Sequence, residues 1–181
     1  MKKTNLTENV ISSRLQAIYT KQDFLVLVKK ILVIALFLFL VFRYIFTFHV
    51  VVGDSMSPNV KNSDLTVIYK MDQKFRQGDV VLISKNDISY IVRVIGMPGD
   101  TILFNEKGEV ILNNEKYEED YIFEKTYADN NTNTYPLKLN SNEYFLLGDN
   151  RTTSKDSRDF GVVSIDEIKG KVIYVFRNRE V

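Results

Sequence analysis

The sequence predicts a mostly β domain, built as a compact barrel or sandwich, behind one N-terminal helix long enough to cross a membrane. Two observations carry this prediction. A single long apolar run occupies residues 31–48, and after it short runs rich in Val, Ile, Tyr and Phe alternate with Gly, Pro, Asn and Asp. Short strands at regular spacing are typical of small barrels and sandwiches. A chain of 181 residues has room for one such domain and an anchor.

Residues 1–30 form a polar leader in which apolar side chains recur at three- and four-residue spacing. These side chains are Val10, Ile11, Leu15, Ile18 and Tyr19. The spacing is typical of an amphipathic helix that lies on a membrane. A loosely ordered tail accounts for the same composition, and the sequence leaves both interpretations open.

The apolar run is the expected transmembrane helix. It begins with twelve uninterrupted apolar residues, Ile31–Phe42, and continues past Arg43 to Phe48. The eighteen residues of the run give about 27 Å of helix at roughly 1.5 Å per residue, just enough for the hydrocarbon core. Arg43 lies near the end, where its guanidinium can reach the headgroups. A cleaved signal peptide would have a shorter leader and a small-residue cleavage motif, and a buried globular helix remains the other alternative.

Charge is unevenly distributed about this run. Residues 1–48 carry seven Lys/Arg and two acids, whereas residues 49–181 carry seventeen and twenty-one. By the positive-inside rule we expect a single-pass protein of the bacterial cell membrane, with a cytoplasmic N-terminus and an extracytoplasmic domain at 49–181. The lipid bilayer is then one partner. A basic excess confined to the membrane-proximal part argues against binding to nucleic acid.

Seven strands are expected in the outer domain, and turn residues separate them. Residues 113–143 are polar and weakly patterned, least of all at Asp129–Asn133, and we interpret them as an insertion or flap. A helical turn is expected around Ser164–Ile168. The expected strands are Leu65–Tyr69, Val80–Ile83, Tyr90–Ile95, Thr101–Phe104, Val110–Leu112, Tyr144–Leu147 and Lys171–Phe176.

Composition excludes several chemistries. The chain has no cysteine and one histidine, and its eight glycines are scattered at turns rather than gathered in a phosphate loop. We therefore expect no cofactor, no metal site and no thiolate nucleophile. A Ser-His-Asp triad would need His49, six residues before Ser55 at the membrane edge, and geometry argues against it. A serine protease without histidine can use lysine as its base, because burial lowers the pKa of the amine.

Four segments, in order, carry a resemblance to a known family. Gly53–Pro58 resembles the nucleophile box of type I signal peptidases, membrane-anchored enzymes that remove signal peptides on the outer face of the bacterial membrane. Gly78–Val81, Tyr90–Asp100 and Gly148–Arg158 are similar to the boxes that follow it. Together with the apolar run, the resemblance covers most of residues 30–177.

The resemblance assigns roles within the first box. It makes Ser55 the nucleophile, with Gly53, Met56 and Pro58 as supporting residues. Gly53 stands where some family members supply a serine hydroxyl, so backbone N–H groups would have to hold the oxyanion.

The sequence departs from the family at the general base. The family has its lysine immediately before Arg93, and here that residue is Val92. Valine cannot accept a proton, and the guanidinium of Arg93 does not deprotonate in proteins. Ser154 stands where the family has a serine that hydrogen-bonds the lysine. Asp156 and Arg158 stand where it has a structural ion pair.

Two other lysines come into question as bases. If residues 80–84 and 89–95 form a hairpin, residue 85 pairs near 88 and residue 92 near 81. Lys85 would then lie on the order of 13 Å from position 92 at 3.3 Å per residue, beyond the reach of its side chain. Lys155 lies inside the last box, and the resemblance gives it no role.

Two functions follow from the resemblance. In the first, the chain is a signal peptidase in which Ser55 cleaves signal peptides from exported preproteins, bound as an added strand at a sheet edge. In the second, it is a catalytically silent chaperone that holds a pilin precursor or another preprotein for pilus assembly, as small family members with altered dyads do in Gram-positive bacteria. Ser55 favours the first function and Val92 the second.

Overall fold

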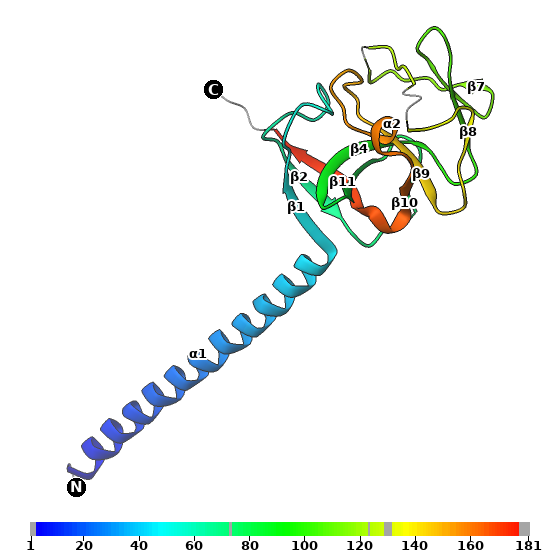
Figure 1. Ribbon diagram of the computed structural model, residues 1–181. Helices are drawn as coiled ribbons and strands as arrows, with labels where there is room; N and C mark the ends of the chain where they lie inside the picture. Colours follow the sequence, from blue (N-terminus) through cyan, green and yellow to red (C-terminus); the bar gives the residue numbers. More distant parts are fainter. Residues whose placement is uncertain (1–2, 73, 123, 129–131, 178–181) are drawn as a thin grey trace. The chain divides into compact units, whose positions relative to one another are not determined.

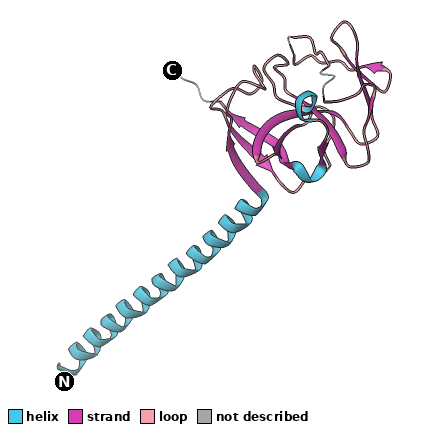
Figure 2. Cartoon of the chain, in the orientation of Figure 1, coloured by secondary structure: helices cyan, strands magenta, loops and turns pink. Residues whose placement is uncertain are grey.

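The computed structural model describes residues 3–72, 74–122, 124–128 and 132–177. The chain separates into two units, Met1–Tyr44 and Ile45–Val181. The first unit is helical, and the second is built mainly from antiparallel strands (Figures 1 and 2). The prediction of a mostly β domain behind one apolar helix is confirmed.

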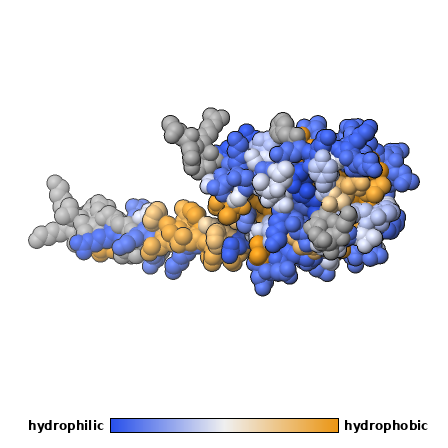
Figure 3. Space-filling view, turned by 45° about the horizontal axis from the view of Figure 1, so that its top comes forward, coloured by the Kyte–Doolittle hydropathy of each residue, from blue (hydrophilic) through white to orange (hydrophobic). Residues whose placement is uncertain are grey.

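Helix α1 spans Lys3–Ile45 and contains neither glycine nor proline. By length and composition its part from Thr20 to Ile45 can cross a membrane, and none of that part is buried within the protein. Figure 3 shows apolar side chains along part of the helix on the face in view, and the residues of Ile31–Phe42 are all apolar. A helix that is apolar around its whole circumference needs an apolar surrounding. From Lys3 onward, the polar leader belongs to this same helix.

The helix ends three residues before the expected boundary at Phe48. Residues Phe46–Val50 instead form strand β1. It pairs antiparallel with β2 (Leu65–Tyr69) along its whole length, from Phe46↔Tyr69 to Val50↔Leu65. Phe, Thr and Val suit a strand, and pairing with β2 overrides helix propensity, which is a weak preference. The expected run 31–48 therefore crosses from helix into sheet.

Seven strands form one antiparallel sheet in the order β1-β2-β11-β3-β4-β9-β10. Its centre is the hairpin of β3 (Val80–Lys85) and β4 (Ile88–Gly96), which turns at Asn86 and Asp87, both with positive φ. In the described part of the chain, β1 and β10 are the two edges of this sheet. The remaining strands are β9 (Glu143–Leu147), β10 (Val163–Ser164) and β11 (Ile168–Phe176).

A second sheet has four strands in the order β7-β6-β5-β8. Residues 113–143, expected as an insertion or flap, supply two of its strands, and residues 129–131 of the expected unstructured part lie outside the described residues. The expected turn near Ser164–Ile168 is the 3-10 turn η1 (Ile165–Glu167). The strands are β5 (Thr101–Phe104), β6 (Val110–Leu112), β7 (Glu115–Lys116) and β8 (Leu137–Lys138).

Three apolar clusters fill the β domain. The first lies on the central sheet and contains Val92 with side chains from β3 and β9. The second contains Ile102 of the smaller sheet and Phe145 of the larger, so it joins the two sheets. The third packs Met56 against Ile91 of β4. Segments before and after the central hairpin therefore meet at β4.

Candidate functional site

Ser55 lies on a tight turn that follows β1. The N–H of Ser57 donates to the carbonyl of Asp54 at 3.0 Å, and the N–H of Val60 donates to the carbonyl of Met56 at 2.9 Å. We call residues 53–60 the Ser55 turn. Its backbone is held by its own hydrogen bonds.

Apolar packing in the core also holds the Ser55 turn in place. Met56 is fully buried and lies in the cluster that contains Ile91. Gly53 has a φ of 89°, in the left-handed region that favours glycine. Ser55 is half-buried and Pro58 is exposed. The turn therefore presents the serine at the surface while the methionine beside it is fixed in the core.

Gly148 lets the Ser55 turn approach the segment that follows β9. The N–H of Asn150 donates to the carbonyl of Ser55 at 2.9 Å. A Cβ on Gly148 would lie 2.1 Å from the Oγ of Ser154 and 2.6 Å from the carbonyl oxygen of Ser55. Only glycine fits at this position. Its missing side chain brings residues 55 and 154 together.

Val92 lies beside this contact. β4 pairs with β9 at Arg93↔Leu147, and continuing that register by one residue places Val92 opposite Gly148. Directly opposed residues of an antiparallel pair share a face, with their Cβ positions about 5 Å apart. Val92 is fully buried among apolar side chains. The position where the family has its base is thus next to Ser154, and it is filled by hydrocarbon.

The hydroxyl of Ser154 is buried and has no hydrogen-bond partner among the described residues. Leaving a buried hydroxyl unpaired costs about 1–3 kcal/mol, so such a group needs an explanation. The family resemblance supplies one. It assigns this serine to hydrogen-bond a lysine, and Val92 has neither a donor nor an acceptor in its side chain.

Lys85, one of the other candidate bases, is paired with an acidic side chain. The expected hairpin register is confirmed, with Val81↔Val92 and Lys85↔Ile88. The Nζ of Lys85 lies 2.9 Å from a carboxylate oxygen of Glu167.

Two further candidates are a lysine and the histidine. Lys155 is exposed. His49 lies within β1 opposite Thr66, where burial lowers its pKa.

Asp156 and Arg158 form the expected ion pair, with the Nη2 of Arg158 2.9 Å from the Oδ2 of Asp156. The same carboxylate accepts the N–H of Gly148 at 3.1 Å. Asp156 also caps the short helix α2 (Ser157–Phe160). Arg158 donates in turn to the carbonyl of Arg151 at 2.7 Å. The pair therefore holds Gly148 in position.

Sequence reasoning missed a second set of contacts around the Ser55 turn. Arg93 donates to both carboxylate oxygens of Asp149, at 2.8 and 2.5 Å. Asn59 donates to the same carboxylate at 2.9 Å and to the carbonyl of Tyr121 at 3.1 Å. The guanidinium of Arg93 lies 4.2 Å from the centre of the Tyr121 ring. Because Asn59 belongs to the Ser55 turn, these bonds tie the turn to β4, to the end of β9 and to Tyr121.

Arg151 and Glu119 form a buried ion pair that is connected to these contacts through Tyr121. The two side chains are 0% and 5% exposed. Arg151 also donates to the carbonyl of Gly148 at 2.9 Å and to the hydroxyl of Thr126. The hydroxyl of Tyr121 donates to Glu119 at 2.9 Å. Burial, and the negative charge of Glu119 beside it, raise the pKa of the Tyr121 hydroxyl well above its ordinary value.

The missed residues differ in the signal they leave in the sequence. Arg93, Asp149 and Arg151 lie inside the boxes that carry the resemblance, so the motifs could have indicated them. Glu119 and Tyr121 lie in the weakly patterned segment, beside an acidic run that is typical of a solvated surface.

Comparison with known proteins gives one family. The family model described as "Signal peptidase, peptidase S26" matches residues 24–177, a range that includes all four boxes. Signal peptidase I S of Bacillus subtilis is 35% identical over 159 residues, which cover 81% of this chain and 86% of that protein. Signal peptidase IB of Staphylococcus aureus is 32% identical over 175 residues, which cover 86% and 91%. A crystal structure of a signal peptidase I from Enterococcus faecalis is 27% identical with a TM-score of 0.48, and the match covers 55% of this chain and 97% of that one.

Proposed function

Because this chain belongs to the signal peptidase family, we propose that it is a membrane-anchored serine endopeptidase of low activity. It binds the signal peptides of exported preproteins, with Ser55 as the nucleophile at the scissile bond. Cleavage is slow because Val92 occupies the position of the general base.

One observation carries this proposal. The carbonyl of Ser55 and the hydroxyl of Ser154 meet across Gly148, on the face of the sheet that Val92 shares. The nucleophile position and the partner of the family's lysine are therefore adjacent in this chain. This adjacency supports a site in which only the general base is missing.

An open edge on β4 supports binding of an extended peptide. β4 pairs with β3 along Ile88–Arg93, but with β9 only from Arg93 to Gly96. Among the described strands, none pairs with residues 88–91 on the β9 side. A signal segment can add a strand there through main-chain hydrogen bonds, as edge-binding peptides do. This open edge ends beside Val92, which is the position of the missing base.

An apolar face of the larger sheet supports a location at the membrane surface. Phe48 and Val50 of β1 and Tyr174 and Phe176 of β11 are between 51% and 57% exposed. They share a face, since both strands pair with β2 in matching register. β1 follows the apolar helix α1 without a linker, and exposed apolar patches mark contact surfaces. The proposed topology has the N-terminus in the cytoplasm and the β domain outside.

Chemistry at the site would depend on the groups that remain. Backbone N–H groups of the Ser55 turn can stabilise an oxyanion. Proton removal from Ser55 would fall to water, and general-base assistance is typically worth about 10²–10⁴-fold. The expected activity is smaller than that of an enzyme with a lysine by about this factor.

Val92 favours a second function, that of a catalytically silent chaperone. A fully buried valine at the base position removes proton transfer and leaves the open β4 edge intact. Such a protein would hold a pilin precursor or another preprotein without cutting it, for pilus assembly.

Cleavage of a preprotein by the purified full chain in detergent tests both functions. We compare the native protein with Ser55→Ala, Val92→Lys and the double variant of both. Ser141→Ala, which alters an exposed serine in a loop, is the control for the serine substitution. The proposal expects slow native cleavage, none in Ser55→Ala, and an increase of about 10²–10⁴-fold in Val92→Lys that the double variant loses again.

Other outcomes separate the alternatives. A native protein that binds preprotein without cutting it, and that cuts only as Val92→Lys, is the silent chaperone. Cleavage that survives in Ser55→Ala would overturn the assignment of the nucleophile.

A further inference from the structure

Residues 117–122 and 124–126, which together we call the strap, border two pockets of the β domain. The N–H of Tyr117 at its start donates to the carbonyl of Val110 at 2.9 Å. The N–H of Thr126 at its end donates to the carbonyl of Gly108 at 2.8 Å. Both ends of the strap are therefore held on the β5–β6 hairpin.

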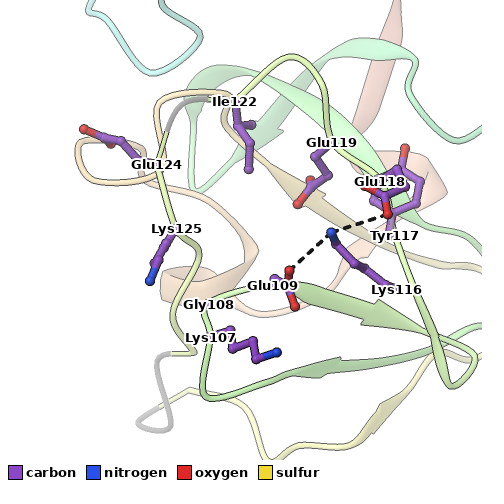
Figure 4. Close-up of a pocket in the computed structure, with 10 residues that line it drawn as sticks. All are labelled: Lys107, Gly108, Glu109, Lys116, Tyr117, Glu118, Glu119, Ile122, Glu124 and Lys125. Carbon is purple, nitrogen blue, oxygen red and sulfur yellow. Dashed lines mark ion pairs between the residues drawn. The ribbon is translucent and has the colours of Figure 1, made fainter.

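On one side the strap borders a pocket of about 270 Å³ over that sheet (Figure 4). Lys116 pairs there with Glu109 at 3.2 Å and with Glu118 at 3.4 Å, and both bonds raise its pKa. Glu124 lines this pocket too, and in Figure 4 its side chain points away from Lys116, Glu109 and Glu118. The charges at the centre of this pocket are satisfied by one another.

On its other side the strap borders a pocket beside the Ser55 turn. This pocket measures about 260 Å³ and is lined by Ser57, Pro58, Glu124, Asp149 and Asn150. Pro58 is three residues from Ser55, a separation of at most about 11 Å along an extended chain. Asn150 donates its N–H to the carbonyl of Ser55. The pocket therefore adjoins the nucleophile position.

Of the two carboxylates that line this pocket, one is paired with a cationic side chain and the other, in the described part of the protein, is not. Asp149 is buried and bonded to Arg93 and Asn59. Glu124 is exposed, and it forms no ion pair with any other residue that the structure describes. One negative charge at the pocket thus lacks a counter-charge within the described chain.

Contacts on both sides hold Glu124 at the pocket. Three residues before it, the carbonyl of Tyr121 accepts from Asn59, and the Tyr121 ring lies under Arg93. Two residues after it, the hydroxyl of Thr126 accepts from the buried Arg151. The position of the strap near Glu124 is therefore set by the same network that holds the Ser55 turn.

We propose that this pocket is a subsite for a basic side chain of the bound preprotein, and that Glu124 determines the preference. The subsite rests on the proposed function, which brings a preprotein to Ser55. A volume of about 260 Å³ lies just below the roughly 300–1,000 Å³ of small-molecule sites, and it suits a single side chain. A lysine or arginine there supplies the missing counter-charge and can donate hydrogen bonds to Asn150.

The subsite binds the preprotein on the mature side, that is, after the scissile bond. The signal segment is assigned to the open edge of β4 at residues 88–91, and none of the residues that line the pocket comes from β4. A chain that runs along this edge and passes Ser55 reaches the pocket within about three extended residues. The basic side chain therefore belongs to the first residues after the scissile bond.

Peptide binding tests this subsite. The probes are three fluorescein-labelled preprotein peptides, identical except for Lys, Gln or Glu at the first two mature positions. Their Kd values are measured by fluorescence anisotropy with the full chain in detergent, in a Ser55→Ala background that prevents cleavage. An exposed ion pair is modest and sensitive to salt, so we expect the Lys peptide to bind about two- to five-fold more tightly than the Glu peptide at low salt.

Variants of Glu124 separate charge from shape. Glu124→Gln should abolish the preference, and Glu124→Lys should reverse it. Glu118→Gln is the matched control, because Glu118 lies on the same strap and is 80% exposed on the other side; it should keep the native preference. Equal affinity for all three peptides, or a preference that survives in Glu124→Gln, would overturn the subsite and leave the proposed function standing. If none of the peptides binds, the proposed function fails and the subsite fails with it.

Discussion

Arg93 and Asp149 join β4 to the end of β9 through two parallel hydrogen bonds, Nε–Oδ1 at 2.8 Å and Nη2–Oδ2 at 2.5 Å. The side chain of Asp149 is fully buried, and that of Arg93 is 13% exposed. Burial opposes the charge of Arg93, but the bonds to Asp149 outweigh it and raise the pKa of the guanidinium. Since Asn59 donates to the same carboxylate, this pair supports the Ser55 turn as well as the sheet.

Asp149→Asn should destabilise the protein strongly. The substitution leaves the guanidinium of Arg93 buried without its counter-charge, and breaking a buried pair in this way costs about 3–5 kcal/mol. The measurement is the free energy of unfolding of the full chain in detergent, followed by circular dichroism. Glu118→Gln is the control, because its partner Lys116 is 47% exposed and an exposed pair is worth about 0–1 kcal/mol. Equal losses in the two variants would mean that the Arg93 charge is solvated rather than paired.

The strands could be predicted where local pattern and final pairing agree. Leu65–Tyr69 and Thr101–Phe104 are apolar runs between turn residues, and their predicted bounds match the structure. β7, β8 and β10 have two residues each, too few for any period to show. Phe46–Val50 suits a membrane helix and a strand equally well, so its partner β2 decides. That information lies about twenty residues further along the chain.

The site could be predicted only as far as its motifs extend. The boxes indicated Ser55, Ser154 and the position of Val92, but the closeness of these residues depends on Gly148 having no side chain. Glu119 could not be found, because its partner Arg151 is 32 residues away and a single long-range ion pair leaves no periodic trace. Its acidic neighbours are typical of a solvated surface, whereas the folded chain buries Glu119 against an arginine.

Ionisation of the Tyr121 hydroxyl should lower the free energy of unfolding at alkaline pH. Burial, and then Glu119, raise the pKa of its hydroxyl above the ordinary value of 10.0. The unfolded chain therefore loses this proton first. The stabilisation is complete below pH 10 and declines above it, at up to about 1.4 kcal/mol per pH unit for one group. Tyr121→Phe keeps the ring under Arg93 but cannot ionise, so it should lose less stability than the native protein between roughly pH 9 and pH 11.

The comparison rests on unfolding free energies at a series of pH values, with tyrosinate absorbance as an independent record of ionisation. Tyr127→Phe is the matched control, because Tyr127 follows the strap and is 58% exposed; it should keep the native slope. A native slope in Tyr121→Phe would show that this hydroxyl ionises equally in the folded and unfolded chains.

Ser154→Ala should be harmless in the native protein and harmful only when residue 92 is lysine. In the native chain the buried hydroxyl has no partner in the described part of the structure, so its removal relieves a penalty of about 1–3 kcal/mol and should leave stability unchanged or higher. In Val92→Lys the hydroxyl gains an amine to hydrogen-bond and orient, and Ser154→Ala should then lower the cleavage rate by about ten-fold or more. A double-mutant cycle over residues 92 and 154 measures both effects, with the free energy of unfolding and the cleavage rate as its two readouts. Strictly additive effects would contradict the shared site, because residues that meet across Gly148 cannot act independently once one of them carries the amine.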